Sequence, residues 1–431
     1  MLAWRQRLIA ELERLVAEGV TIDVAEVPAM PVFSLAHQGF NDCEIQRNLA
    51  RLYRAPAGPA LQATPRQMGA DPRIRVGFLS AYFNTHTIGK LVRGLIANLS
   101  RDEFRVVVLS LGRQCDDEVA QFIRRHADEY LVLPPHLPRA RQAVADARLD
   151  ILFFCEIGMD PTTYTLAYSR LAPVQCATWG HPSTTGMPTM DYFVSSDAME
   201  IASAQEHYTE KLVRLKSLTF QYYRPQPTLP PQSRDSFGLP GGHLYVCPQS
   251  IYKFHPQFDP ILADILRRDS LGQLILIRWA YPQADELLRR RFAASMPDVL
   301  DRIHFIRRVQ QAEFLNLLAV SDVLLDPIPF GGGWTGCEGL SLGTPIVTMP
   351  GQFLRGRITP AMYRRIGVLD CLAENPQQYA QIAVRLGTDA AYRRAIHEKI
   401  LAHNHRLFEA PDAVEEMQAF FRAAVTNATT A

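Results

Sequence analysis

Three consecutive glycines stand directly before a predicted helix start, in the segment FGGGWTGCEGLSLGTPIVTMPG from Phe330 to Gly351. Glycines at this place let backbone N–H groups approach an anion, and the helix dipole favours negative charge there. The segment does not match G-x-x-x-x-G-K-[ST], so it is not the phosphate loop of nucleoside triphosphatases. The pattern therefore predicts a phosphate site of another kind.

The residues after the glycines also indicate a capped helix. Thr335 and Glu338 have capping-box spacing, and Gly343 stands where a glycine commonly follows a helix. A capped helix starting near Thr335 accounts for these three residues. It does not account for the three glycines from Gly331 to Gly333.

Three other residues with reactive side chains follow apolar runs. Lys253, in CPQSIYKFHPQFDP, is either a solvated surface lysine or a phosphate contact. His86, in SAYFNTHTIGKL, stands where a general base would be needed, although a lone histidine is more often structural. His181 lies in the turn-rich segment GHPSTTG. The chain has no D-x-D pair and no cluster with metal-ligand spacing, so we expect a site without a metal.

The elements that position these residues are short, nearly continuous apolar runs, as expected for parallel strands buried on both faces. The first set is Arg73–Ser80, Val106–Leu111, Asp150–Phe154, Val174–Gly180 and Asp191–Ser196. After a proline-rich passage, Tyr222–Gly242, a second set reads HLYVCPQS, QLILIRW, RIHFIRR, DVLLDP and PIVTMP. Helical segments separate the runs. The pattern predicts an α/β protein with two doubly wound Rossmann-like domains facing a cleft.

The N-terminus, MLAWRQRLIAELERLVAEG, predicts an amphipathic helix and no signal peptide. A Pro/Ala/Gly-rich stretch, RAPAGPALQATPRQ, ends this first block. The expected organisation is a helical segment over 1–70, an acceptor-side domain over 71–225, a linker over 226–242, a nucleotide-sugar domain over 243–395 and C-terminal helices over 396–431.

Composition excludes several classes of function. The 431 residues are 47% hydrophobic and 21% charged, with a formal net charge of +1, so nothing favours nucleic acid or an anionic membrane. No apolar run reaches the roughly 20 residues that span a bilayer. Seven cysteines without a C-x-x-C pair indicate reduced thiols and a cytoplasmic protein.

Several motifs together resemble the catalytic region of the O-GlcNAc transferase/SPINDLY family. They are RVGFLSAYFNTH, APVQCATWGHPSTTGMPTMDYFVSSD, QSIYKFHP and the stretch from DVLLDP through EGLSLGTPIVTMPGQFLRGR, and they occur in the family's order between about Arg73 and Asp370. The resemblance implies a GT-B type fold and an inverting glycosyltransferase with a nucleotide-sugar donor and a protein or peptide acceptor. It implies no metal or other cofactor.

The resemblance also implies roles for individual residues. His86 and Lys253 match the family's active-site histidine and its pyrophosphate-contacting lysine, and both are expected to be catalytic. Backbone amides at Gly333, Trp334 and Thr335 are expected to hold the phosphates, and Gly180–Pro182 matches a loop near the sugar. The expected donor-binding set is Gln249, Val309, Gly332, Gly333, Trp334, Thr335, Glu338, Arg357, Gly180, His181 and Pro182.

The departures from the family pattern leave the donor open. Gly333 and Trp334 replace a histidine and a threonine, and Gln311 and Phe314 replace a lysine and a histidine beside uracil. Cys337-Glu338 is similar to the Cys-Glu of the SPINDLY branch. The favoured donor is UDP-GlcNAc or a UDP-hexose, with transfer to Ser/Thr or Asn. The alternatives are a GDP-fucosyl transferase, a catalytically weak sugar-nucleotide-binding protein and an enzyme that glycosylates lipid or glycan. A tetratricopeptide array is not recognisable, and residues 1–70 could hold at most a remnant.

Overall fold

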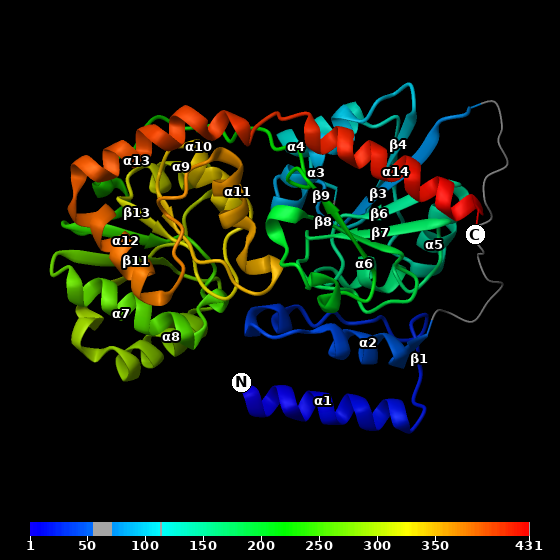
Figure 1. Cartoon of the computed structure of the whole chain (residues 1–431). Coiled ribbons are helices and arrows are strands. Elements are labelled where there is room, and N and C mark those ends of the chain that lie inside the picture. The colour runs from blue at the N-terminus through cyan, green and yellow to red at the C-terminus, as the bar shows by residue number, and fades with distance from the viewer. Residues whose placement is uncertain (55–70, 113, 431) are drawn as a thin grey trace. The chain divides into compact units, whose positions relative to one another are not determined.

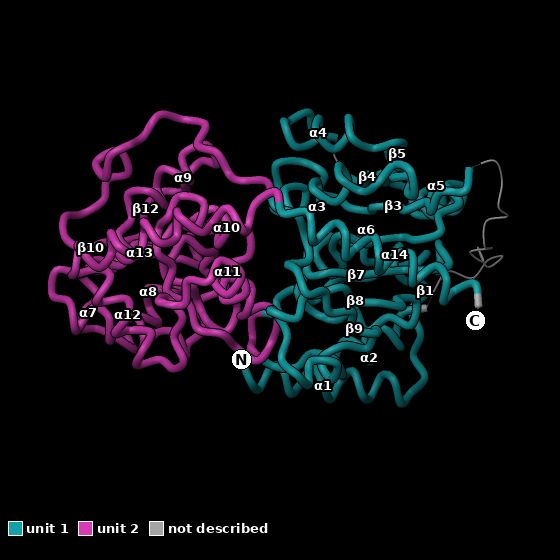
Figure 2. Tube along the Cα trace, turned by 45° about the horizontal axis from the view of Figure 1, so that its top comes forward, with its two compact units in different colours: residues 1–36, 40–222, 410–431 teal, residues 37–39, 223–409 magenta. Residues whose placement is uncertain are grey.

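The computed structural model describes residues 1–54, 71–112 and 114–430 of the chain (Figure 1). The stretch RAPAGPALQATPRQ lies almost wholly outside these residues. The chain divides into two compact units, which Figure 2 colours separately. Unit 1 contains residues 1–36, 40–222 and 410–431, and unit 2 contains residues 37–39 and 223–409.

Unit 1 is built on a parallel sheet that, over the described ranges, has seven strands in the order β5-β4-β3-β6-β7-β8-β9. Every neighbouring pair in it is parallel. The strands are β3 (Ile74–Ser80), β4 (Phe104–Ser110), β5 (Glu129–Val132), β6 (Ile151–Phe154), β7 (Val174–Thr178), β8 (Tyr192–Ser196) and β9 (Lys211–Leu215). The five apolar runs predicted for this half of the chain are confirmed as β3, β4, β6, β7 and β8. The two edge strands, β5 and β9, were missed because they carry charged residues and are only partly buried.

The helices that connect the strands of unit 1 in the described ranges are α3 (Thr87–Asn98), α4 (Glu118–His126), α5 (Leu137–Asp146) and α6 (Pro161–Leu166), and α14 (Asp412–Thr430) joins them. The last of them comes from the end of the chain. Phe421 of α14 packs against Phe104 and Phe153, with ring centroids 6.2 and 6.0 Å away. The amide of Ser100 donates to Oε1 of Gln418 at 2.7 Å. The chain therefore returns to its first unit after completing the second.

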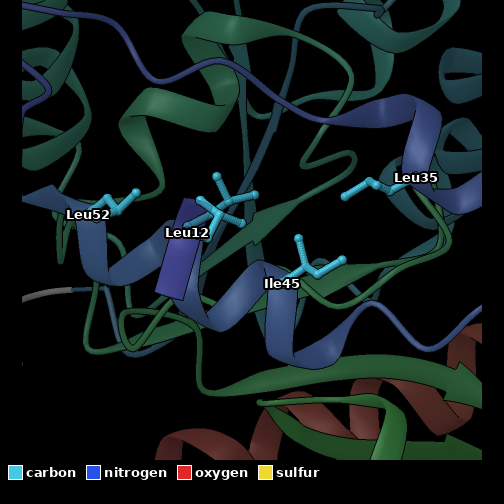
Figure 3. Close-up of a cluster of buried hydrophobic side chains, with 5 residues drawn as sticks. Leu12, Leu35, Ile45 and Leu52 are labelled. Carbon is cyan, nitrogen blue, oxygen red and sulfur yellow. The ribbon is translucent and has the colours of Figure 1, made fainter. Parts of the chain in front are cut away.

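The N-terminal segment of unit 1 begins with a helix, where the amphipathic pattern predicts one. It contains α1 (Leu2–Ala17), α2 (Cys43–Leu52) and a minor pairing of β1 (Ile22–Asp23) with β2 (Tyr53–Arg54). Leucine and isoleucine side chains from α1, α2 and the short 3-10 helix Phe33–Gln38 between them form a small core (Figure 3). Its members are Leu12, Leu35, Ile45, Leu49 and Leu52.

Unit 2 is built on a second parallel sheet, with the order β12-β11-β10-β13-β14 among the described strands. All five predicted runs are confirmed, as β10 (His243–Cys247), β11 (Gly272–Ile277), β12 (Ile303–Ile306), β13 (Val323–Leu325) and β14 (Ile346–Val347). Its helices are α7 (Asp259–Arg268), α8 (Pro282–Ser295), α9 (Gln311–Ala319), α10 (Trp334–Ser341), α11 (Ile358–Ile366), α12 (Pro376–Thr388) and α13 (Ala390–His403).

The strand order locates one ligand crevice in each sheet. In a doubly wound sheet, ligands bind beyond the carboxyl ends of the strands where the order reverses. In unit 1 the order reverses between β3 and β6, and in unit 2 between β10 and β13. The loops after these four strands are therefore the candidates for a functional site.

Candidate functional site

In unit 2 the loop after β10 and the loop after β13 lie side by side where the strand order reverses. The first loop carries Gln249 and Lys253, and the second is the glycine loop. The Lys253 ammonium donates to Oε1 of Gln249 and to the carbonyl of Gly331, both at 2.9 Å. It also lies 4.5 Å from the ring centroid of Phe330. Lys253 is thus not a solvated surface lysine, since its amine is held against the glycine loop.

Burial lowers the pKa of Lys253 to about 8, although the nearby carboxyl of Asp326 acts in the opposite direction. The ammonium is therefore poorly hydrated and still mostly charged at neutral pH. A partly desolvated cation beside a helix start is suited to hold an anion.

Asp326, directly after β13, organises the glycine loop, and the sequence interpretation missed it. Its buried carboxylate accepts from the amide of Gly332 at 2.5 Å and from the hydroxyl of Thr348 at 2.7 Å. Burial raises the pKa of Asp326, while these hydrogen bonds and Lys253 favour its charged form. An aspartate at the carboxyl end of a buried strand, in DVLLDP, is the signal that could have identified it.

Two of the three glycines have a packing reason. A Cβ on Gly331 would lie 2.7 Å from Oδ2 of Asp326, and one on Gly332 would lie 2.8 Å from Nε2 of Gln249. A larger residue at Gly331 would have to displace the buried, hydrogen-bonded carboxylate of Asp326, and one at Gly332 would have to move the end of the Gln249 side chain. The run of glycines in the sequence is therefore explained in part by the close approach of the loop to the Asp326 carboxylate, and not by a ligand alone.

The helix after the loop starts at Trp334, with Gly333 as its N-cap. The predicted capping box is wrong, because Thr335 lies inside the helix and the N-cap makes no side-chain hydrogen bond. The buried carboxylate of Glu338 accepts from the indole Nε1 of Trp334 at 2.8 Å. Gly343 does follow the helix in the left-handed conformation, with φ +76°. Glu338 therefore fixes the Trp334 side chain within the helix.

The amides at the start of α10 differ in what they can do. The amide of Gly332 is committed to Asp326, and that of Gly331 donates to the carbonyl of Arg355 at 2.9 Å. The first amides of a helix lie at the positive end of its dipole, so those of Trp334 and Thr335 are placed to meet an anion. The turn containing Arg355 also leads to Arg357, which donates from Nη1 to the carbonyl of Gly351 at 3.0 Å.

Val309 is placed further along the same sheet edge. It follows β12, which is separated from β10 by β11. The structure thus brings together Gln249, Lys253, Gly332, Gly333, Trp334, Thr335, Glu338 and Arg357, and leaves Val309 at the outer strand. Among the residues that the structure describes, no group of three or more His, Cys, Asp or Glu could hold a metal ion.

In unit 1 the reversal point carries His86. The residue is the N-cap of α3, and its Nδ1 accepts from the amide of Ile88 at 3.2 Å. Its ring stacks on Tyr82 with centroids 4.4 Å apart. Burial lowers the pKa of His86, and Lys90 adds to the effect. Since Nδ1 accepts a hydrogen bond, the neutral ring carries its proton on Nε2, which makes His86 a hydrogen-bond donor at neutral pH.

The loop Gly180–Pro182 after β7 lies against the loop after β6. A Cβ on Gly180 would come within 2.0 Å of the carbonyl of Cys155, so the two loops touch through their backbones. His181 is buried, with its ring 5.2 Å from that of Phe33. A buried ring of this kind shapes the loop.

Glu156, after β6, is a second residue that the sequence interpretation missed. Its fully buried carboxyl accepts from the amide of Ala81 at 3.0 Å, which ties it to the start of the His86 loop. Burial raises the pKa of Glu156 to about 8, so the group is mostly protonated at neutral pH. The glutamate that ends FFCE, directly after a buried strand, was the available signal.

Comparison with known proteins identifies the family. The profile described as glycosyl transferase family 41 matches residues 57–222 and 224–417. The chain belongs to glycosyl transferase family 41. The resemblance to the O-GlcNAc transferase/SPINDLY family is thereby confirmed, and solved structures confirm the GT-B-like fold.

Curated relatives and solved structures agree with this family. The chain is 24% identical over 420 residues, 92% of its length, to the probable UDP-N-acetylglucosamine–peptide N-acetylglucosaminyltransferase SEC of Arabidopsis thaliana. It is 25% identical over 334 residues, 74% of its length, to the SPINDLY protein of the same plant, which carries the same enzyme description. It spans only 42% and 36% of these two relatives.

Two structures show the same fold. A mutant O-GlcNAc transferase of Thermobaculum terrenum matches with a TM-score of 0.79 and 24% identity, over 91% of this chain and 77% of that one. Anabaena HepE, in complex with UDP and glucose, matches with a TM-score of 0.53 and 13% identity, over 81% of this chain and all of that one. No helix in the described part of this chain has the length and hydropathy to cross a bilayer.

Proposed function

We propose that this family member is an inverting, metal-independent protein glycosyltransferase. It transfers a sugar from UDP-GlcNAc or a UDP-hexose to a serine or threonine hydroxyl or an asparagine amide. The observation that supports this proposal is the position of Lys253 against the glycine loop, at the strand reversal of unit 2. The relatives whose names specify UDP-N-acetylglucosamine and peptide support the choice of donor and acceptor.

In the proposed reaction the acceptor atom forms a bond to the anomeric carbon, and the bond from that carbon to the diphosphate breaks. The acceptor gives up its proton to water or to the departing diphosphate, on which negative charge accumulates. The Lys253 ammonium and the amides at the start of α10 stabilise that charge, as a metal ion does in other transferases. Asp326 positions the glycine loop through its hydrogen bond with the amide of Gly332. The Lys253 ammonium is already held in place by Gln249 and Gly331, so it needs little rearrangement to meet the diphosphate.

His86 acts in this proposal as a hydrogen-bond donor that orients the acceptor or the sugar. The Nδ1 atom is engaged by the amide of Ile88, so the ring offers the proton on Nε2. A neutral histidine at a helix N-terminus is a known way to polarise an oxygen atom without carrying a charge. This role replaces the general base that its position in the sequence suggests.

A second candidate is a sugar-nucleotide-binding protein with little transferase activity. Gly333 and Trp334 favour it, because Trp334 directs its indole to Glu338 and Gly333 has no side chain to reach a phosphate. Incubation with UDP-GlcNAc, UDP-glucose and GDP-fucose separates the candidates. The transferase should release free nucleoside diphosphate slowly without acceptor and label a peptide library faster. Binding without release would favour the second candidate, and release from GDP-fucose alone would change the donor.

A further inference from the structure

A cavity of about 280 Å³ lies in unit 2 at the sheet edge opposite to the glycine loop. Ser321 and Asp322, directly before β13, and Thr344, shortly before β14, form one wall. The other wall comes from Arg234 and from the first two turns of α13. The volume of the cavity is close to the lower end of the range for small-molecule pockets, which is about 300–1,000 Å³.

The lining of this cavity is strongly basic. Arg234, Arg393 and Arg394 face it, and Asp322 is its one acidic residue. Asp322 contacts Nη2 of Arg234 at 2.9 Å and Nη2 of Arg393 at 3.1 Å, so it is shared by two cations. Arg394 is exposed, and its side chain makes no hydrogen bond or ion pair within the described ranges of the chain. The lining thus carries more positive than negative charge.

Two of the three guanidinium groups are held rigidly. Arg234 donates to the carbonyls of Val320 and Gly242, both at 3.1 Å. Arg393 donates to the carbonyls of Leu386 and Gly387, both at 2.8 Å. With its contact to Asp322, each uses three of its five N–H donors, which leaves two for a ligand. A ligand would not have to order these side chains.

The hydroxyl groups of the cavity present acceptors. The Ser321 hydroxyl donates to the carbonyl of Leu317 at 2.7 Å, and that of Thr344 donates to the carbonyl of Leu318 at 3.1 Å. Because each hydrogen is already used, the two oxygen atoms offer only lone pairs. They are suited to ligand hydroxyl groups and unsuited to a bare anion.

We propose that this cavity binds a phosphorylated sugar or polyol, at a site separate from the glycine loop. The phosphate contacts Arg393 and Arg394, and the ligand hydroxyls donate to Ser321 and Thr344. Arg234 adds charge from the linker side. The proposal does not depend on the donor or acceptor of the transfer reaction.

Isothermal titration of the full chain with glucose 6-phosphate, inorganic phosphate and glucose tests this proposal, each with and without saturating UDP. We expect glucose 6-phosphate to bind more tightly than either of the other two probes, and UDP to leave its affinity unchanged. Arg394→Gln should weaken the binding by about tenfold or more, since a charge-assisted hydrogen bond is lost. Ser321→Ala should weaken glucose 6-phosphate but not inorganic phosphate.

Arg290→Gln is the matched control, because Arg290 is an exposed arginine of α8 paired with Glu286 and does not line the cavity. It should leave the affinity unchanged. Absence of saturable binding at millimolar probe, competition by UDP, or equal binding by the wild type and Arg394→Gln would each overturn the proposal. Equal affinity for phosphate and glucose 6-phosphate would overturn the hydroxyl part. Melting temperatures confirm that the variants are folded.

Discussion

At the scale of single residues, Lys253 combines a functional position with an unusual environment. Its amine is bonded to Gln249 and to the carbonyl of Gly331, and burial lowers its pKa to about 8. Asp326 lies close enough to oppose that shift. The charge that should hold the diphosphate therefore depends on pH in an accessible range.

UDP affinity should fall as pH rises through about 8. Above that pH the free chain has lost the Lys253 proton and must take it up again to bind the anion, so binding becomes weaker. Titration with UDP between about pH 7 and pH 9 should show this decline. Lys253→Arg should remove it, because arginine stays protonated over this range. If the affinity of the wild type for UDP is constant over this pH range, Lys253 does not contact the phosphate.

His86 can be tested by two substitutions that differ in their effect on the helix. His86→Ala removes both the N-cap of α3 and the Nε2 donor, whereas His86→Asn keeps a good N-cap but is too short to place a donor where Nε2 stands. If the donor serves catalysis, both variants should lose about 10²–10³ in kcat, with little change in UDP affinity. If the cap alone matters, His86→Asn should restore turnover and melting temperature together.

At the scale of elements, the course of the glycine loop is set by its close contacts with the side chains of Asp326 and Gln249. The sequence predicted the loop and the helix after it, but the predicted capping box was wrong and the packing reason for the glycines was missed. These two features depend on the hydrogen bonds of Trp334, Glu338 and Asp326. The partners in these bonds become known only from the folded structure. The strand runs were predictable because buried parallel strands are apolar throughout, whereas the edge strands β5 and β9 are not.

Gly331→Ala should destabilise unit 2 by about 1–3 kcal/mol, because its Cβ would clash with Oδ2 of Asp326. Gly241→Ala is the control, since a Cβ there meets nothing within 4 Å. Thermal and urea unfolding of both variants measure the difference. Equal stability of the two would mean that the loop can move away from Asp326, contrary to the geometry described.

At the scale of the whole molecule, the chain builds one α/β unit, then a second, and ends by returning to the first. The sequence predicted two doubly wound domains and C-terminal helices. It held no signal that α14 completes unit 1, because that packing rests on Phe421 meeting Phe104 and Phe153, residues far away along the chain. The position of each crevice could not be predicted from the sequence either, because it depends on where the strand order reverses, and that order is known only from the structure.

Phe421→Ala should therefore destabilise unit 1, by about 3–5 kcal/mol for a fully buried phenylalanine. Phe420→Ala, at the neighbouring and only partly buried position, should cost clearly less. Urea unfolding followed by hydrogen exchange should locate the loss in β3, β4 and β6. Equal effects of the two substitutions would contradict the packing of α14 on this sheet.

The central claim is that a nucleoside diphosphate binds without metal where Lys253 meets the glycine loop. Titration of the wild type and Lys253→Met with UDP, in excess EDTA and then with Mg²⁺, tests it most directly. We expect the wild type to bind equally well in both conditions. Lys253→Met should bind about tenfold or more weakly, since a charge-assisted contact to phosphate is lost. A strict need for metal, or an unchanged affinity in Lys253→Met, would contradict the claim.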